Sequence, residues 1–384
     1  MRIKLRTITP IFIGAGPEGV LSPLMDYVRI KNQFGLVNRE VLLKMLEELD
    51  IIDDYVIKIK QSNDSFSLTE FMAEHGISQE DFSKLFSKKN FLKLKGIEQN
   101  KNSAPQISSF ISSAGRKYIP GSSIKGSIRT AIAYAFLKKI NQGFSDIERK
   151  LGNKAKFAFQ NSSLQFKVFS SKFSKSSKYD AKDDFLKVLR VRDSDSIPRS
   201  DFVVVPCYSY HIGEGKEGPP VYLECLDEGK EAEIEIGLFR GNSPIYERAS
   251  NFWSFLRYDE ERAVRIIFEF LNEFARDFVN HEIERLRGRE VRGVLNFYSD
   301  LRKELDSPLE GKALMLIGRG TTFFGKTIDM LWGDDIEKLR DRFRERSLGV
   351  INGGKSKPFP ISRLLWNDGG YWKPIGWASL EISS

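Results

Sequence analysis

The sequence predicts an α+β fold whose sheets are antiparallel. Near the N-terminus, apolar side chains alternate with basic ones over residues 2–7, which is the period of a strand with one buried and one solvated face. Farther along the chain, apolar residues recur at steps of three and four from Val264 to Phe278, which predicts one long helix. Strands and helices follow one another without the regular β-α-β spacing of a parallel sheet, so antiparallel sheets are favoured.

The first two strands are predicted to form a β-hairpin with a long tip. The strand over residues 2–7 leads into a glycine turn that contains Gly14 and Gly16. Residues 24–30 carry strand-forming side chains, and we expect them to return beside the first strand.

A group of short helices is predicted to be inserted after this hairpin. Asn38 can cap a helix over residues 39–49, where apolar residues recur at helical spacing. Residues 62–95 predict shorter helical pieces around Phe71, Phe82, Leu85 and Phe86. We expect this inserted helical lobe at about residues 38–115.

The later elements are predicted from similar patterns. Ser122 or Ser123 can cap a helix that turns apolar residues such as Ile128 and Ile132 inward. A mobile loop is expected over residues 162–182, because serine and lysine dominate it. The prediction is completed by strands over residues 185–191, 202–205 and 233–239, a long helix from near Asp259, and a helical C-terminal region.

The chain is long enough for two domains. It has 384 residues, and a hydrophobic content of 41% supports an ordinary buried core. We expect an N-terminal domain over residues 1–200, which includes the helical lobe and the mobile loop, and a related C-terminal domain over residues 201–384.

Two stretches each place glycines and a lysine on a turn that opens into a predicted helix. They are residues 119–130 and residues 317–327. Glycine lets the backbone approach a ligand, free N–H groups at a helix start point outward, and lysine adds positive charge. Both stretches are therefore suited to holding phosphate.

The second stretch also matches the P-loop pattern of nucleotide-binding proteins, through Gly320, Gly325, Lys326 and Thr327. A P-loop needs parallel strands after it, one of them ending in an acidic residue that holds magnesium. Only a short arginine-rich tail follows here. Phe323 and Phe324 would crowd a loop around a triphosphate, whereas they could stack on a base or fill a core. A P-loop NTPase is therefore an alternative with less support than a nucleic-acid backbone contact or a structural glycine turn.

The charge of the chain favours a polyanionic partner. It carries 60 basic and 52 acidic residues, and this modest excess matters where it is concentrated. A single basic run is also explained by a solvated helix face, but three runs together with the two glycine stretches favour a polyanion. An aromatic content of 12% would let bases stack. The runs are Arg285, Arg287, Arg289 and Arg292; Arg340, Arg342, Arg344 and Arg346; and Lys167, Lys172, Lys175 and Lys178.

The composition argues against secretion, membrane insertion and a structural metal. Only Cys207 and Cys225 are present, which is too few for a disulfide framework or a four-cysteine zinc site. The first residues form a strand pattern rather than a signal peptide, and no run reaches the roughly 20 apolar residues that cross a bilayer. We expect a cytoplasmic protein without a cofactor.

The three histidines give no catalytic motif. His75, His211 and His281 are far apart in sequence, and no zinc-binding or serine-nucleophile pattern accompanies them. His281 is expected at the edge of a core, and His211 lies in a glycine-rich segment where it could touch RNA or simply occupy a turn.

Carboxylates are the remaining catalytic candidates. Asp193 and Asp195 follow a predicted strand, and one well-placed aspartate can support metal-assisted cleavage of a phosphodiester. Pairing with Arg190 and Arg192, or capping of a turn, explains these two residues more simply.

These segments, in this order, resemble the repeat-associated mysterious proteins (RAMPs) of CRISPR effector complexes. The resemblance covers most of the chain. A Pro374-Ile-Gly-Trp377 signature makes the chain most similar to the subunit that caps the crRNA 3′ end in type III-A (Csm) complexes. The other features that carry it are the basic first strand, the glycine turn at residues 14–19, Ile119-Pro-Gly-Ser-Ser-Ile-Lys-Gly-Ser-Ile-Arg129, Arg190-Val-Arg-Asp-Ser-Asp-Ser196, and the late loop ending Gly325-Lys-Thr327.

The resemblance implies ferredoxin-like, RRM-like modules that track a single RNA strand. It implies a place at the head of a filament of repeating RAMP backbone subunits, beside a small helical subunit. The implied partners are crRNA and single-stranded target RNA, with a contribution to crRNA maturation and target binding. The candidate RNA-binding residues are Gly14, Gly16, Gly121, Ser122, Ser123, Lys125, Arg129, His211, Gly318, Arg319, Gly320, Lys326 and Thr327.

Asp26 raises the alternative of a RAMP endoribonuclease. In the repeating backbone subunits of such complexes, an aspartate on the loop after the first strand cuts target RNA, and Asp26 falls near the matching position. Here the sequence around it is Leu21-Ser-Pro-Leu-Met-Asp-Tyr-Val28 rather than a glycine-glycine-isoleucine-aspartate run. The resemblance therefore implies a non-catalytic subunit.

Overall fold

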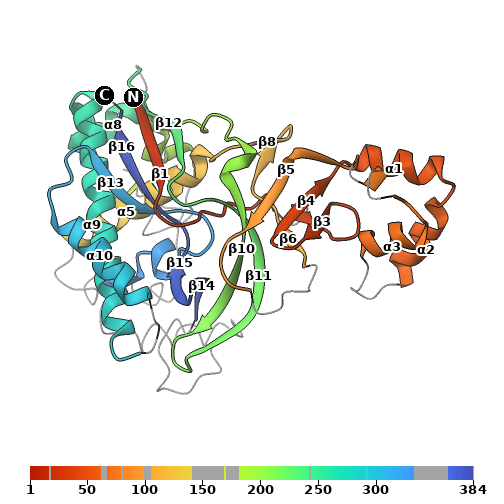
Figure 1. Cartoon of the computed structure of the whole chain (residues 1–384). Coiled ribbons are helices and arrows are strands. Elements are labelled where there is room, and N and C mark those ends of the chain that lie inside the picture. Colours follow the sequence, from red (N-terminus) through yellow and green to blue (C-terminus); the bar gives the residue numbers. More distant parts are fainter. Residues whose placement is uncertain are drawn as a thin grey trace, which may run out of the picture.

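Most of the described strands belong to two large sheets that lie next to each other, as Figure 1 shows for the computed structural model. Helices cover one sheet, and a small helical lobe projects beyond the other (Figure 1). The structure describes residues 1–16, 19–61, 67–78, 81–82, 84–98, 105–140, 168–169, 181–241, 244–289, 291, 293–332 and 362–383.

The five-stranded sheet unites both ends of the chain in the order β13-β16-β1-β12-β9, and all neighbours in it are antiparallel. Helices follow β1 and β12, so the order β16-β1-β12-β9 is the β-α-β-β-α-β arrangement of a ferredoxin-like unit, to which β13 adds an outer strand. The α+β prediction is confirmed. The strands are β1 (Arg2–Thr7), β9 (Leu189–Val191), β12 (Glu231–Leu238), β13 (Lys312–Leu316) and β16 (Trp377–Ile382).

Strand β1 shows why an alternating sequence becomes a central strand. Its side chains alternate between buried and exposed, with Ile3 and Leu5 completely buried. The exposed face carries Arg2 and Lys4, which pair with glutamates of β12 at N–O distances of 3.2 and 3.4 Å. The basic face predicted from the sequence is therefore matched by acidic side chains on the neighbouring strand.

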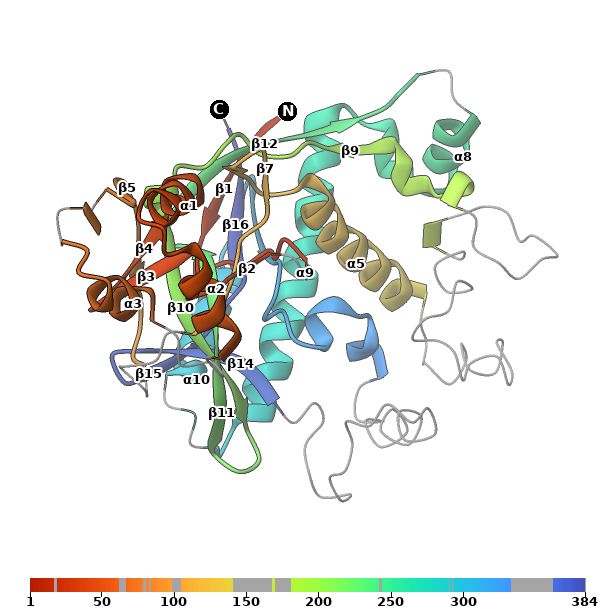
Figure 2. The same cartoon turned by 90° about the vertical axis from the view of Figure 1, so that its right-hand side faces the viewer.

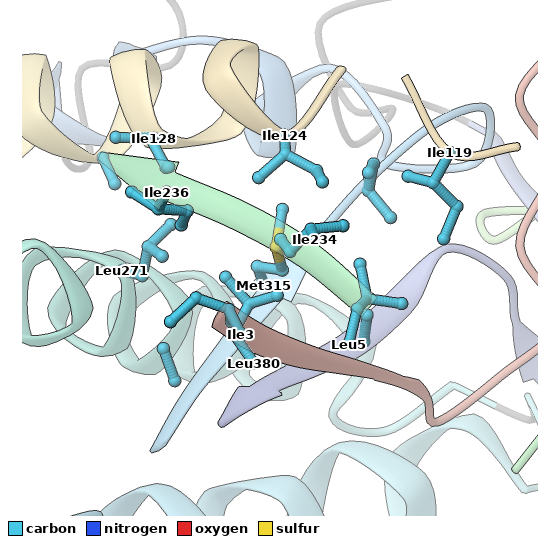
Figure 3. Packing of buried hydrophobic residues seen from close by; sticks show 14 of the residues in the cluster. Ile3, Leu5, Ile119, Ile124, Ile128, Ile234, Ile236, Leu271, Met315 and Leu380 are labelled. Carbon is cyan, nitrogen blue, oxygen red and sulfur yellow. The ribbon is translucent and has the colours of Figure 1, made fainter. Parts of the chain in front are cut away.

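Two long helices pack against each other and cover one face of this sheet (Figure 2). They are α5 (Gly121–Ile140) and α9 (Glu260–Leu286). Asp259 begins α9 by accepting a hydrogen bond from the Arg262 N–H at 2.8 Å, which confirms the predicted start of that helix. Figure 3 shows the shared core, where side chains of both helices meet those of the sheet: Ile124 and Ile128 of α5, Leu271 of α9, and Ile3, Ile234 and Ile236 of the strands.

The C-terminal part of α9 contributes to a second core. Phe278, Val279 and Leu286 pack with residues of α10 (Val294–Asp306) and with Trp377 of β16. A shorter helix, α8 (Pro244–Phe252), precedes α9. The helix predicted from near Asp259 is α9, and α10 follows it, whereas the last described residues, 362–383, form strands rather than the predicted helical C-terminal region.

The second sheet is built around a long hairpin of β10 and β11, which confirms and extends the strand predicted at residues 202–205. Its order is β2-β6-β11-β10-β5-β4-β3, with β14 pairing beside β10 and β15 beside β14. Its strands are β2 (Val20–Leu21), β3 (Tyr27–Ile30), β4 (Gln33–Val37), β5 (Phe86–Leu94), β6 (Ile107–Ser108), β10 (Phe202–His211), β11 (Lys216–Leu226), β14 (Ser362–Asp368) and β15 (Tyr371–Pro374). A separate pair joins β7 (Ser112–Ser113) and β8 (Arg116–Lys117).

The helical lobe lies between β4 and β5 in the chain. It contains α1 (Arg39–Glu48), α2 (Ile52–Gln61) and α3 (Leu68–Glu74), which enclose a small core of their own. The Asn38 side chain accepts hydrogen bonds from the N–H groups of Glu40 and Val41, so the predicted cap is confirmed.

Three predictions about local structure are wrong. Strand β3 does not return beside β1: it pairs with β4 in the second sheet, because the chain after β1 crosses to that sheet, where Ile11 forms a bridge with Leu226 of β11. Residues 86–94 form strand β5 rather than a helical piece, since they find partners on β4 and β10. Residues 185–188 form a 3₁₀ turn, so the strand there is limited to β9.

Other predictions are left open by the structure. Most of the loop expected at residues 162–182 lies outside the described residues, although Val168 and Phe169 are described and buried. The division into domains at residue 200 stays a prediction, and the sheets do not follow it, because β1 pairs with β12 and β16.

The outer edge of β13 is closed by a side chain rather than by another strand. The Asn272 amide of α9 donates to the Lys312 carbonyl at 2.8 Å and accepts from the Leu314 N–H at 2.9 Å. These are the bonds that a neighbouring strand would supply, so this edge is unavailable for pairing with another chain. Among the described residues, no helix combines the length and the apolar character needed to cross a membrane.

Candidate nucleic-acid interface

The N-terminal glycine turn and the late loop, far apart in sequence, lie against each other. The Arg319 N–H donates to the Phe12 carbonyl at 2.8 Å. Gly318 has φ +76°, and a Cβ placed there would lie 2.2 Å from the same carbonyl oxygen, so only glycine fits. Beyond Phe12, the turn exposes Gly14 and Gly16 to solvent.

The C-terminal signature joins these two loops. The Gly376 N–H donates to the Pro10 carbonyl at 2.9 Å, and the Gly376 carbonyl accepts from Ile317 at 2.8 Å. A Cβ on Gly320 would lie 2.4 Å from the Ile375 side chain, so close packing requires glycine at this position too. We call residues 12–16, 317–322 and 374–377 together the glycine-loop cluster.

The N-terminal part of α5 is linked to the glycine-loop cluster through the end of β13. The Ser127 hydroxyl donates to the carbonyl of Leu316, the last residue of β13, at 2.6 Å. Gly121 lies against the chain after β9, where a Cβ would be 2.3 Å from the Val191 carbonyl oxygen. The two phosphate-type stretches predicted from the sequence therefore come together in the fold.

Asp193 occupies the helix start that was predicted to face phosphate. Its Oδ1 accepts a hydrogen bond from the Gly121 N–H at 2.8 Å, while the Ser194 hydroxyl accepts from the Ile119 N–H at 2.9 Å. The prediction that Ser122 or Ser123 caps α5 is wrong, because the helix begins at Gly121 and both serines lie in its first turn. The simpler interpretation of Asp193, as a cap, is confirmed.

The two cations that the sequence analysis placed near phosphate at the start of α5, Lys125 and Arg129, already have protein partners. Lys125 Nζ donates to the Leu189 carbonyl on the outer edge of β9 at 2.7 Å, and burial lowers its pKa. Arg129 pairs with Asp184 at 2.6 Å and lies over the Phe169 ring at 3.9 Å. Both residues join α5 to its surroundings, and contacts of either with RNA stay a prediction.

The late loop does not have the structure of a P-loop. After β13 it forms only a three-residue 3₁₀ turn (Phe324–Lys326), followed by Thr327 in extended conformation. The prediction that this loop opens into a helix is wrong for the described residues, and within them β13 pairs with the antiparallel strand β16 rather than with a parallel strand. Phe324 is buried against His281, which confirms that it can fill a core. This geometry does not support the NTPase alternative.

A cavity of about 330 Å³ opens beside the late loop. One side carries Arg319, Gly320, Thr322 and Lys326, and the other carries Ser209, Val221 and Leu364 from β10, β11 and β14. Partial burial of the ammonium group lowers the pKa of Lys326, and the nearby Arg319 guanidinium lowers it further. No periodicity in the sequence links the strand residues to this loop, so they were not predicted as site residues.

His211 and Thr327 are not among the residues that line this cavity, although each neighbours a residue that does. His211 ends β10, opposite Ser362 of β14, on the same strand face as Ser209. Thr327 accepts a weak hydrogen bond from the Asp329 N–H at 3.4 Å. Neither contact involves a ligand, so a role of either residue in RNA binding stays a prediction.

A buried ion pair supports the N-terminal glycine turn. Glu224 Oε2 accepts from Lys117 Nζ at 2.6 Å, from the Phe110 N–H at 3.0 Å and from the Ser109 hydroxyl at 3.1 Å. Phe110 in turn pairs with Gly14. This support was also missed, because nothing in the sequence connects Glu224 with a turn some 200 residues earlier.

Asp26 is buried and fully engaged within the protein. Its Oδ1 accepts from the Arg39 side chain, with Nε at 2.6 Å, and its Oδ2 accepts from the Ser22 N–H at 2.8 Å. The carboxylate thus closes the turn before β3 and ties it to α1. No cluster of three or more histidine, cysteine, aspartate or glutamate residues suited to a metal occurs in the described parts of the chain. Cys207 and Cys225 are buried, and burial raises the pKa of both thiols.

Comparison with known proteins supports a shared family and fold. A family model described as the RAMP superfamily matches residues 4–324. Two curated proteins with the name "CRISPR system Cms protein Csm5" are similar to this chain. The protein from Methanocaldococcus jannaschii is 23% identical over 415 aligned residues, which cover 100% of this chain and 89% of that protein. The protein from Streptococcus thermophilus is 27% identical over 243 residues, covering 61% of this chain and 63% of that one.

Two solved structures share the fold. A chain in the structure described as "Cryo-EM structure of Csm-crRNA-target RNA ternary complex in type III-A CRISPR-Cas system" superposes with a TM-score of 0.74 at 23% identity, covering 99% of this chain and 100% of that chain. The crystal structure of T. onnurineus Csm5 superposes with a TM-score of 0.67 at 23% identity, covering 98% and 99%.

Proposed function

The chain belongs to the RAMP superfamily, and from this membership we propose that it is a non-catalytic, crRNA-binding subunit of a type III-A CRISPR effector complex. In this role it caps the head of the backbone filament at the crRNA 3′ region. It contributes there to crRNA maturation and to target RNA binding in a cytoplasmic ribonucleoprotein. Its similarity to two proteins named Csm5, and to a chain of a Csm-crRNA-target RNA complex, supports the assignment.

The observation that carries the proposal is the meeting of the glycine loops. Segments that begin at residues 12, 317 and 374 form one hydrogen-bonded cluster, and the start of α5 reaches it through Ser127. The late loop adds two exposed cations, Arg319 and Lys326. Cations presented beside backbone segments that hydrogen-bond to one another suit contacts to phosphates, which fix a strand without reading its sequence.

The partners follow from the same proposal. They are crRNA, single-stranded target RNA, a repeating RAMP backbone subunit and a small helical subunit. A subunit that caps the head of a filament needs one face for RNA and another for its neighbour, and the closed edge of β13 removes one route of association through strand pairing.

The first test separates a scaffold from a nuclease at Asp26. Asp26→Asn is expected to lower the free energy of unfolding by about 1–2 kcal/mol, because it weakens the hydrogen bonds to Arg39 and Ser22. The purified chain, incubated with labelled RNA and magnesium, is expected to leave the RNA intact with or without the substitution. Gel analysis of the RNA and thermal unfolding of the protein measure the two effects.

The nuclease alternative makes the opposite prediction. It requires cut product with the unsubstituted chain and its disappearance with Asp26→Asn. Arg39→Gln serves as a matched control, since it breaks the same ion pair but keeps the carboxylate. Cleavage that survives Arg39→Gln and vanishes with Asp26→Asn would contradict the scaffold proposal.

A further inference from the structure

The cavity beside the late loop has two chemically different sides. The late loop supplies the cations Arg319 and Lys326, whereas the β10–β11 hairpin and β14 supply the apolar side chains Pro219, Val221 and Leu364. Ser209 and Lys326 are exposed at its margin, so the cavity is open to solvent. A ligand that fits both sides carries negative charge at one end and a flat or apolar group at the other.

The two cations line the same cavity without a compensating acid. Within the described parts of the chain, neither Arg319 nor Lys326 forms an ion pair, and Arg319 is the one charged group that shifts the pKa of Lys326. Two like charges held close together disfavour each other, and a bound anion would relieve that repulsion. The cationic side is therefore arranged for an anion supplied from outside the chain.

The loop that bears these cations is also strained. Thr322, which lines the cavity, has φ +57°, an unfavourable conformation for a β-branched residue. Its hydroxyl is buried and has no hydrogen-bond partner among the described residues. Strain and unsatisfied polar groups of this kind concentrate at ligand-binding sites.

We propose that this cavity holds one unpaired nucleotide of the bound RNA, with its phosphate at Arg319 and Lys326 and its base against Val221 and Leu364. The inference rests on the proposed function and adds to it a base-binding subsite built from the hairpin and β14. The volume of about 330 Å³ exceeds what a bare phosphate fills and lies at the lower end of the roughly 300–1,000 Å³ range of small-molecule pockets. The open margin lets the RNA backbone continue on either side of the held nucleotide.

Filling the apolar side tests the subsite without removing charge. Val221→Trp and, independently, Ser209→Trp place an indole in the cavity and are expected to weaken binding of a labelled 12-nucleotide RNA by about tenfold, the loss expected for one base contact. The slope of log affinity against log salt is expected to stay unchanged, because no phosphate contact is lost. Fluorescence anisotropy with the full chain measures both quantities. Ser113→Trp, exposed on β7 outside the cavity, is the control and is expected to bind as the parent does.

A second arm replaces single nucleotides of the RNA by abasic ones. An abasic nucleotide at one position is expected to lower the affinity of the parent chain about tenfold. The same abasic nucleotide is expected to have little effect on the affinity of Val221→Trp, because both changes remove the same contact. Thermal unfolding identifies a variant that fails to fold, in which case Ser209→Trp, at an exposed position, carries the test.

The outcomes separate this inference from the proposed function. RNA binding that is insensitive to both tryptophans and to every abasic position overturns the subsite and leaves the proposed function intact. A free nucleoside monophosphate that saturates the cavity while labelled RNA stays bound also overturns it. Absence of RNA binding at low salt overturns the proposed function itself.

Discussion

Glu282→Ala is expected to lower the free energy of unfolding by about 3–5 kcal/mol, the cost of leaving one partner of a buried ion pair alone. Glu282 on α9 and Arg363 on β14 are almost completely buried, with relative exposures of 0% and 2%. The carboxylate accepts two hydrogen bonds from the guanidinium, at 2.6 and 2.8 Å. Equilibrium denaturation of the purified chain measures the loss.

A double variant distinguishes the lost charge from the lost packing. Glu282→Leu combined with Arg363→Met replaces the pair by apolar side chains, so no buried charge remains unpaired. We expect it to be more stable than Glu282→Ala by about 2–4 kcal/mol. A double variant as unstable as the single one would show that the site depends on shape rather than on charge.

Gly318→Ala is expected to destabilise the fold by about 2–4 kcal/mol, as the sum of a strained backbone conformation and a disturbed hydrogen bond. Gly318 has φ +76°, and the new Cβ would lie 2.2 Å from the Phe12 carbonyl oxygen that accepts from Arg319. The late loop must then move away from the N-terminal turn. Weaker RNA binding is expected together with the lower unfolding midpoint.

Gly126→Ala is the matched control for this change. Gly126 lies within α5, and a Cβ there has no neighbour within 4 Å. Alanine is favoured over glycine inside a helix by about 0.5–1 kcal/mol, so the control should be neutral or slightly stabilising. Equal destabilisation by both substitutions would contradict the steric account of Gly318.

The elements that were predicted correctly are those whose pattern is local. The apolar stripe of α9, with Asp259 before it, is complete within one stretch of sequence. Strand β1 alternates over six residues, and Asn38 caps α1 through the two N–H groups that follow it. In each case the residues that decide the structure are neighbours in the chain.

Pairing between distant strands was not predictable in the same way. The sequence predicted strands at the positions of β1 and β3, and the predicted hairpin assumed that these consecutive strands pair with each other. The fold instead places β12 and β16 beside β1. Residues 86–94 looked helical in isolation, and they are a strand because β4 and β10 lie on either side. Tertiary pairing here outweighs the local pattern.

The candidate site was predicted in part. The glycine stretches predicted close approach of the backbone to a ligand. The structure brings the two stretches together, but Gly318 and Gly320 lie against protein atoms. The helix start at Gly121 was expected to be open, but Asp193 reaches it from a segment 72 residues later. The apolar side of the cavity was missed because its residues come from two strands, β11 and β14, that only the fold brings together.

The salt dependence of RNA binding tests the central claim most directly. Affinity of the purified chain for labelled single-stranded RNAs of unrelated sequence is measured over a range of salt, for the parent and for Arg319→Gln/Lys326→Gln. The double variant is expected to bind all of these RNAs more weakly and to lower the salt slope by about 1.4, or about 0.7 for each lost phosphate contact. Lys44→Gln/Lys303→Gln, at exposed lysines of α1 and α10, should leave the slope unchanged. An unchanged slope in the first pair, or no binding at low salt, would contradict the account.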